Sequence, residues 1–149
     1  MRCVVQRVAE ASVTVAGRRV AEIGRGLLVL AGVSRGDDEK DLAWMAKRIA
    51  HLRIFPDAEG KMNLGPLEVG AGILLVSQFT LCANIRKGNR PSFVEAMEPV
   101  VAEQMVERLA DAIAGFGLSV KTGRFGALMN VALVNEGPVT IILDSQLPA

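Results

Sequence analysis

Near its end the chain reads Val131-Ala132-Leu133-Val134-Asn135-Glu136-Gly137-Pro138-Val139-Thr140-Ile141-Ile142-Leu143, with two apolar runs on either side of a Gly-Pro step. Both runs are short, uncharged and rich in β-branched residues, which predicts two buried β-strands. A tight hairpin would use Asn-Gly or Asp-Gly, and proline has no amide to donate to a strand ladder. Either the Gly137–Pro138 bond is therefore cis, or the step ends one strand at a bulge. The pair also offers two carbonyl groups and almost no side chain, which suits a surface that a ligand approaches closely.

The rest of the chain predicts further strands and two main helices. Leu27-Leu28-Val29-Leu30-Ala31-Gly32-Val33 is a continuous apolar run and predicts a central strand. Acidic residues at Asp37-Asp38-Glu39 favour the start of one helix. A longer amphipathic helix is predicted from Pro99 to about Gly115, and its buried residues should be Val101, Met105, Leu109, Ala112 and Ile113. The early connections are too short for crossover helices, so the sheet should be mainly antiparallel, in one α+β domain over residues 1–149.

Composition and charge narrow the class of protein. The chain has 149 residues, 50% of them hydrophobic, and no apolar stretch approaches the roughly 20 residues that span a bilayer. Its first residues do not resemble a signal peptide, and two cysteines, Cys3 and Cys82, fit a reducing compartment. We therefore expect a cytoplasmic protein with no membrane partner.

A formal net charge of +1 argues against a broad face for binding nucleic acid. The local exception is Arg86-Lys87-Gly88-Asn89-Arg90, where three cations surround a glycine. This cluster is either a solvated loop or a contact for a phosphate or a nucleic-acid end.

Several kinds of chemistry have no residues to support them. The only histidine is His51, at the end of the first predicted helix, and the two cysteines are far apart in sequence. A zinc site of His and Cys ligands is therefore not expected. The chain also lacks the glycine-rich motifs of phosphate loops and dinucleotide sites. We expect neither a metal nor a cofactor.

Polar residues interrupt the second predicted central strand, Gly72 through Leu81, at Ser77-Gln78-Phe79-Thr80-Leu81. One interpretation is a strand that leaves the core, with its hydroxyl groups bonded to backbone. The other is a set of backbone amides and the Ser77 and Thr80 hydroxyls facing a pocket, where amides stabilise an oxyanion. Thr80 as a nucleophile needs an activating base, and the sequence shows none.

Together, Ser77-Gln78-Phe79-Thr80-Leu81 and Asn135-Glu136-Gly137-Pro138-Val139-Thr140 resemble the two signature motifs of the D-aminoacyl-tRNA deacylases. The resemblance covers nearly the whole chain and departs from the family at Glu136, where Asp is common. It also includes Gln6-Arg7-Val8, Ala11-Ser12-Val13, Gly26-Leu27-Leu28-Val29-Leu30, Asp57-Ala58-Glu59-Gly60-Lys61-Met62-Asn63, Arg90-Pro91-Ser92-Phe93 and Thr122-Gly123-Arg124-Phe125.

The resemblance implies a homodimer of barrel-like subunits whose active site lies at the subunit interface. Its implied reaction is hydrolysis of the ester that joins a D-amino acid to the 3′ end of tRNA, a proofreading step in translation. Gly137 and Pro138 would form a cis element that enters the partner's pocket and excludes L-amino acids with its carbonyls. Arg7 would hold that element in place, and Met129 would line the site beside it.

By the same resemblance, Ser77, Gln78, Phe79 and Thr80 form the other wall of the site. The Phe79 and Thr80 amides would polarise the ester carbonyl, while the Phe79 side chain packs in the core. The family is thought to use the substrate's own 2′-hydroxyl to activate water, with Thr80 as nucleophile the less favoured alternative. Glycyl-tRNA, including glycine mischarged on tRNA(Ala), should also be a substrate.

Two other functions remain open from the sequence. One is a non-catalytic dimer that binds a small molecule or assists translation, because no catalytic base is evident. The other is a deacylase of altered chirality preference with a trans Gly137–Pro138 bond.

Overall fold

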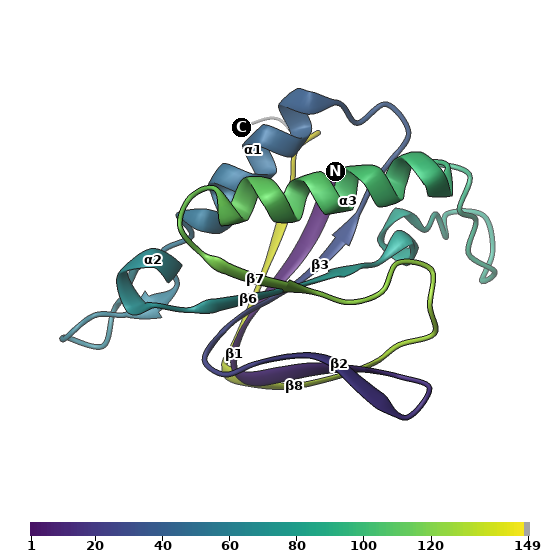
Figure 1. Ribbon diagram of the computed structural model, residues 1–149. Helices are drawn as coiled ribbons and strands as arrows, with labels where there is room; N and C mark the ends of the chain where they lie inside the picture. Colours follow the sequence, from purple (N-terminus) through teal and green to yellow (C-terminus); the bar gives the residue numbers. More distant parts are fainter. Residues whose placement is uncertain (148–149) are drawn as a thin grey trace.

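A long strand, β1 (Arg2–Val15), is the centre of the sheet in the computed structural model, which describes residues 1–147 (Figure 1). Its first half pairs with β3 and its second half with β2. Strand β8 pairs along its other edge from Arg2 to Thr14, with shifts in register at Arg7 and Ala9. The strand order is β2-β1-β3-β6-β7, with β8 joined to β1. The other strands of this sheet are β2 (Arg18–Ile23), β3 (Gly26–Gly32), β6 (Gly72–Ser77), β7 (Ser119–Thr122) and β8 (Asn130–Asp144).

The sheet is mixed and curls into a nearly closed barrel. Strand β1 is antiparallel to β2, β3 and β8, as the short early connections predict. The β3–β6 and β6–β7 pairs are parallel, which the prediction of a mainly antiparallel sheet did not include. Their connections contain helices and are long enough for crossovers. These connections hold α1 (Glu39–Ala50), the β4 (Phe55–Pro56) and β5 (Met62–Leu64) pair, α2 (Pro66–Val69), the 3₁₀ helix η1 (Phe79–Cys82) and α3 (Pro99–Ala114).

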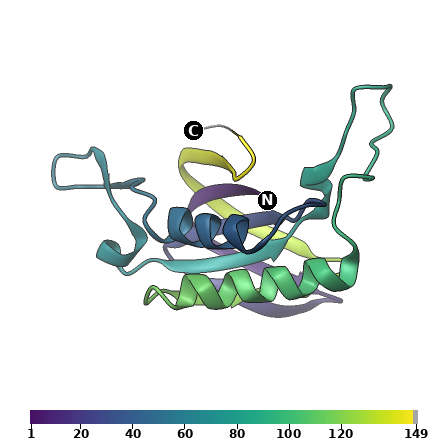
Figure 2. The same ribbon diagram turned by 90° about the horizontal axis from the view of Figure 1, so that it is seen from above.

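Helices α1 and α3 lie side by side over one face of the sheet (Figures 1 and 2). The continuous apolar runs of β3 and β6 are explained by cores on both faces of these strands. Val29 and Leu75 face the core beneath the helices, whereas their neighbours Leu28 and Leu74 face the core inside the curled sheet. Both faces of a central strand must then be apolar. No helix within residues 1–147 is long and apolar enough to cross a membrane.

The two predicted main helices are present. Asp38 caps α1, because its side chain accepts from the Lys40 and Asp41 amides while Asp41 bonds back to the Asp38 amide. In α3 the predicted burial of Met105, Leu109 and Ile113 is confirmed. The predicted burial of Val101 is wrong, since it is 40% exposed, and the neighbouring Ala102 turns towards the core instead.

Strand β8 corrects the prediction of two fully buried strands. It is one strand that continues past the Gly-Pro step, and its residues alternate between partly buried and exposed. Val134 is 50% exposed and Ile142 is 67% exposed. The sequence shows that both runs are apolar, but their outer face has no covering element within residues 1–147.

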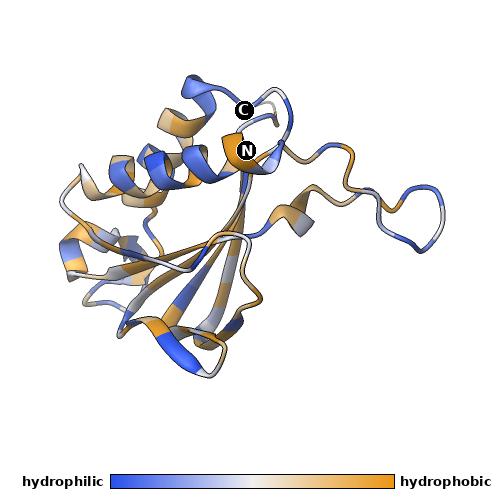
Figure 3. Ribbon diagram, turned by 45° about the vertical axis from the view of Figure 1, so that its right-hand side comes forward, coloured by the Kyte–Doolittle hydropathy of each residue, from blue (hydrophilic) through white to orange (hydrophobic). Residues whose placement is uncertain are grey.

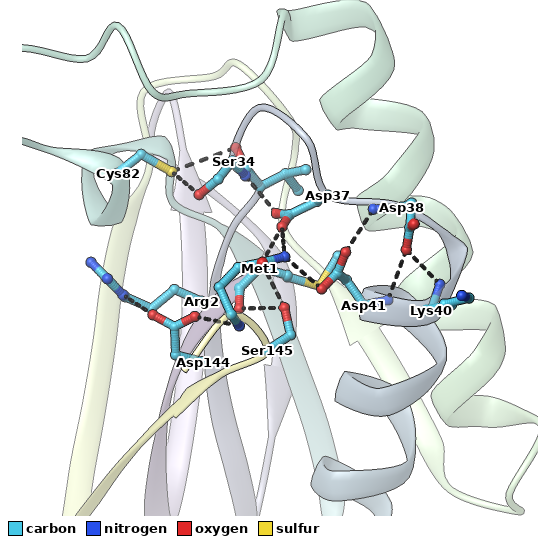
Figure 4. Close-up of polar contacts among 12 residues, drawn as sticks. Met1, Arg2, Ser34, Asp37, Asp38, Lys40, Asp41, Cys82, Asp144 and Ser145 are labelled. Carbon is cyan, nitrogen blue, oxygen red and sulfur yellow. Dashed lines mark hydrogen bonds and ion pairs between the residues drawn. The ribbon is translucent and has the colours of Figure 1, made fainter. Parts of the chain in front are cut away.

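A buried ion pair fastens the first residue to the loop before α1 (Figure 4). The Met1 ammonium pairs with the Asp37 carboxylate, and both side chains are fully buried. The same ammonium donates to Ser145 Oγ over 2.8 Å, and the other Asp37 oxygen accepts from the Ser34 amide over 2.7 Å. The end of β8 is thereby joined to the start of β1.

Both cysteines are free and buried. Burial raises the pKa of the Cys3 thiol to about 12. Cys82 lies in η1, where its sulfur is 3.5 Å from the Val33 carbonyl and 3.4 Å from Ser34 Oγ (Figure 4). Neither thiol is presented to solvent.

Candidate functional site

A cavity of about 670 Å³ opens where β6 ends, between η1, the start of α3 and the segment that leads into β8. This volume lies within the range of pockets that bind small molecules. Its lining is mostly apolar and comprises Ala31, Val33, Arg35, Val76, Ser77, Gln78, Phe79, Phe93, Ala96, Met97, Glu98, Pro99, Ala102, Val106, Phe125, Gly126, Ala127, Leu128, Met129 and Val131.

The polar interruption of the second central strand marks the point where β6 stops. The Gln78 amide donates to the Ala31 carbonyl over 2.7 Å, and η1 begins at the next residue. The first amides of a helix have no acceptor within it, and no hydrogen bond formed within residues 1–147 uses the Phe79 or Thr80 amide. The Thr80 hydroxyl accepts from the Gln78 side chain. Two backbone donors are thus open at the start of η1, and the first of them belongs to Phe79, which lines the cavity.

The side chains of Phe79 and Thr80 lie outside the core. Phe79 is 58% exposed, so the prediction that it packs in the core is wrong. The turn into η1 directs its ring outward against Phe93, with the ring centroids 5.0 Å apart and edge to face. Thr80 is exposed and does not line the cavity.

Met129 lines the same cavity as Ser77, Gln78 and Phe79. Its sulfur is held close to Gly123, where an added Cβ would lie 2.7 Å from it. The Gly123 amide in turn donates to the Leu75 carbonyl of β6 over 3.1 Å. The wall that carries Met129 is therefore anchored to the strand that ends at Ser77.

Gly137 and Pro138 are exposed and joined by a cis peptide bond. Arg7 lies beside them, and its Nε donates to the Glu136 carbonyl over 3.0 Å, while its Nη1 donates to the Ile54 carbonyl over 2.6 Å. The Asn135 side chain spans the Gly-Pro step, because it accepts a hydrogen bond from the Val139 amide over 2.8 Å. Gly137 has a φ of +140°, a conformation that requires glycine.

Within one chain the two predicted walls of the site are apart. The Gly-Pro step lies opposite Arg7 on β1, whereas Ser77 is level with Ala31 and Cys3. The separation is roughly 13 Å along the strands and about three strand spacings across the sheet. Met129 lies with Ser77 and not with the Gly-Pro step of its own chain.

The ionisable side chains that line the cavity are Arg35 and Glu98. Glu98 caps α3 by accepting from the Val100 amide over 3.0 Å, and Arg35 donates to the Ala96 carbonyl over 3.3 Å. His51 ends α1, where its Nδ1 is 2.9 Å from the Lys47 carbonyl, and it does not line the cavity. Within residues 1–147, no group of three or more His, Cys, Asp or Glu side chains could hold a metal ion.

Several cavity residues have no assigned role in the sequence analysis. Phe93 and Phe125 fall in segments that carry the family resemblance, so that resemblance could have identified them as site residues. Arg35 and Glu98 have no such signal, since they come from loops that fold back against the cavity. A linear sequence does not show which loops meet.

Comparison with known proteins gives concordant results. The family model described as D-Tyr-tRNA(Tyr) deacylase matches residues 4–144. A D-aminoacyl-tRNA deacylase from Myxococcus xanthus is 59% identical over 149 residues, which cover 100% of this chain and 97% of that one. A solved structure titled c-Myc DNA Unwinding Element Binding Protein has a TM-score of 0.92 at 43% identity, covering 100% of both chains. Another, titled as a probable eukaryotic D-amino acid tRNA deacylase, has a TM-score of 0.82 at 17% identity, covering 95% of this chain and 97% of that one, and shows the shared fold.

Proposed function

Because the chain belongs to the D-Tyr-tRNA(Tyr) deacylase family, we propose that it hydrolyses the ester linking a D-amino acid to the terminal ribose of tRNA. The protein is then a hydrolase of carboxylic esters that removes D-amino acids before translation uses them, in the cytoplasm where tRNA is charged. The observation that supports this most directly is the pair of open amides at Phe79 and Thr80 beside an apolar cavity. These donors suit an ester carbonyl that becomes an oxyanion, and one such donor contributes about 3 kcal/mol in a protease.

Chiral selection in this proposal uses a second copy of the chain. The Gly-Pro step is exposed and far from the cavity of its own chain. The outer face of β8 and the adjoining Leu128, which is 92% exposed, form an apolar surface that begins at the cavity. Such surfaces mark sites of association. A two-fold dimer would bury this surface and bring each Gly-Pro step to the partner's cavity.

The carbonyls of Gly137 and Pro138 would then face the Cα of the bound amino acid. A D-amino acid presents hydrogen there, whereas an L-amino acid presents its Cβ to the carbonyls. Arg7 supports this role because it bonds to the Glu136 carbonyl immediately before the step. Met129 would form the apolar wall opposite, beside Ser77 and Gln78. Selection would rest on exclusion of the L-enantiomer.

The first test compares D-tyrosyl-tRNA, L-tyrosyl-tRNA and glycyl-tRNA(Ala) as substrates. The D-tyrosyl and glycyl esters should be cleaved, and the L-tyrosyl ester at least about 100-fold more slowly, since overpacking a filled site costs up to about 3 kcal/mol. Release of amino acid from labelled tRNA measures this. Inertness towards glycyl-tRNA would contradict steric exclusion. Binding of all three without loss of ester would instead favour a non-catalytic dimer.

A second test addresses Thr80. If the substrate's 2′-hydroxyl activates water, Thr80→Ala should keep at least about a tenth of kcat/KM, because a lost neutral hydrogen bond costs about 1 kcal/mol. The Thr80 hydroxyl already bonds to the Gln78 side chain, and within residues 1–147 no His, Asp or Glu side chain is hydrogen-bonded to it. Ser119→Ala, at an exposed position at the start of β7, is the matched control. A loss of more than about 1,000-fold with the control unchanged would identify Thr80 as the nucleophile.

A further inference from the structure

Within the segment between η1 and α3, residues 83–96 project from the body of the protein as an arm (Figures 2 and 3). Its stem is closed by a bridge between Asn84 and Ser92, with amide-to-carbonyl distances of 2.8 Å and 3.0 Å. Asn84 Oδ1 also accepts from the Arg86 amide over 2.9 Å, and Gly88 turns the tip with a φ of +86°. The arm therefore has internal structure, and the residues of its tip are exposed.

The tip carries an uncompensated positive charge. Arg86, Lys87 and Arg90 are exposed, and none of the ion pairs formed within residues 1–147 includes them. Without these three cations the chain has 14 Lys and Arg against 16 Asp and Glu, a formal charge of −2. The tip thus gathers three cations within five residues of a chain whose other charges sum to −2, and it is polar in Figure 3.

The base of the arm is part of the cavity. Phe93 lines the cavity and packs on Phe79, which lies just after the end of β6 in the proposed active site. The stem is also tied to the loop after β3, because the Arg35 amide donates to the Glu95 carbonyl over 2.8 Å. The Met97 amide, directly after the arm, donates to the Val33 carbonyl of the same loop over 2.9 Å. From Phe93 to Arg90 is three residues, or roughly 10 Å of extended chain. The tip is therefore held at a set short distance from the cavity mouth.

We propose that this arm binds the phosphodiester backbone of the RNA strand whose 3′ end enters the cavity. The inference rests on the proposed function, and it extends the substrate site beyond the terminal nucleotide. Arginine guanidinium groups match phosphate oxygens in pairs, and lysine adds a point charge. A nucleic-acid strand carries a phosphate about every 3.4 Å of duplex axis, so its last few phosphates fall within reach of the tip. An acidic protein surface would use the same cations but would have no reason to lie beside the cavity.

The test uses the full chain with Arg86→Gln, Lys87→Gln and Arg90→Gln combined. The matched control combines Arg18→Gln, Lys40→Gln and Lys47→Gln, which removes the same charge from exposed positions at the start of β2 and on α1. Each protein is assayed with D-tyrosyl-tRNA and with 3′-O-D-tyrosyl adenosine, which has no phosphate. Binding of uncharged tRNA and sedimentation equilibrium are measured on the same samples.

At about 50 mM salt, the arm variant should bind tRNA and cleave D-tyrosyl-tRNA about 20-fold less well than wild type. At about 200 mM salt its binding and cleavage should approach those of the wild type, because the variant has lost about three single-strand phosphate contacts. The cleavage of 3′-O-D-tyrosyl adenosine and the behaviour of the control should be unchanged. Equal losses on both substrates, a salt dependence equal to that of the wild type, or a changed oligomeric state confined to the arm variant would overturn the proposal. If the wild type cleaves neither ester but the arm variant alone loses tRNA binding, the proposed activity fails while the arm's role stands.

Discussion

D-tyrosyl-tRNA that lacks the 2′-hydroxyl on its terminal ribose is expected to bind normally and to be hydrolysed at least about 100-fold more slowly, since general acid–base assistance contributes about 10² to 10⁴ in rate. The reason lies in the cavity, whose ionisable side chains are Arg35 and Glu98. Glu98 is engaged in capping α3, and Arg35 bonds to a backbone carbonyl. Neither is placed as a free base, and the proposed mechanism therefore assigns the activation of water to the substrate's 2′-hydroxyl.

Single-turnover hydrolysis and equilibrium binding of the deoxy and ribo substrates separate the two effects. The same pair of esters cleaved by dilute hydroxide gives the intrinsic difference in reactivity, which must be subtracted. Equal turnover of the two substrates after this correction would place the activating group on the protein. Glu98→Gln would then be the next variant to examine.

Asp37→Asn is expected to lower the free energy of unfolding by about 3 kcal/mol, because removal of one partner from a buried ion pair leaves the other charge uncompensated. Asp37 is the buried partner of the Met1 ammonium, and it also accepts from the Ser34 amide. In a domain of this size the loss corresponds to roughly 10 °C in Tm. Urea unfolding followed by tryptophan fluorescence of Trp44 measures it.

Asp111→Asn is the matched control for this change. Asp111 is exposed on α3 and forms no ion pair within residues 1–147, so its stability change should stay within about 0.5 kcal/mol. If Asp37→Asn also changed the free energy of unfolding by no more than about 0.5 kcal/mol, the Met1 ammonium would have to bond to water or another acceptor in the folded protein.

The fold could be predicted where the sequence pattern has one physical cause. The unbroken apolar runs of β3 and β6 are required by cores on both faces, and the acidic start of α1 is a capping box at Asp38. The parallel pairs could not be predicted from connection length in the first three strands, because they depend on crossovers through α1 and α3. The burial of β8 was predicted wrongly because the apolar character of a strand does not reveal whether its own chain covers it.

The candidate site was predictable only in part. The polar step at Ser77 marks the end of β6, and the cavity lies there. The Phe79 side chain points outward because η1 begins there, and no periodic pattern of apolar residues predicts this short helix. The sequence left the Gly137–Pro138 bond open between a cis bond and a bulge at a strand end. The structure has the cis bond, and the register of β8 against β1 also shifts at this step, although β8 does not end there. The distance between this step and the cavity could not be read from either motif, because it follows from strand register.

The reactivity of the two buried thiols would report how the folded protein opens. Thiol reagents attack the thiolate, and with a pKa of about 12 the Cys3 thiol is protonated at neutral pH. The Cys3 side chain belongs to the core between the sheet and helices α1 and α3, so alkylation there requires that core to open. Cys82 lies in η1 at the base of the arm and would be reached by a smaller excursion. The order in which a mass label reaches the two positions therefore distinguishes movement at the cavity mouth from loss of the whole fold.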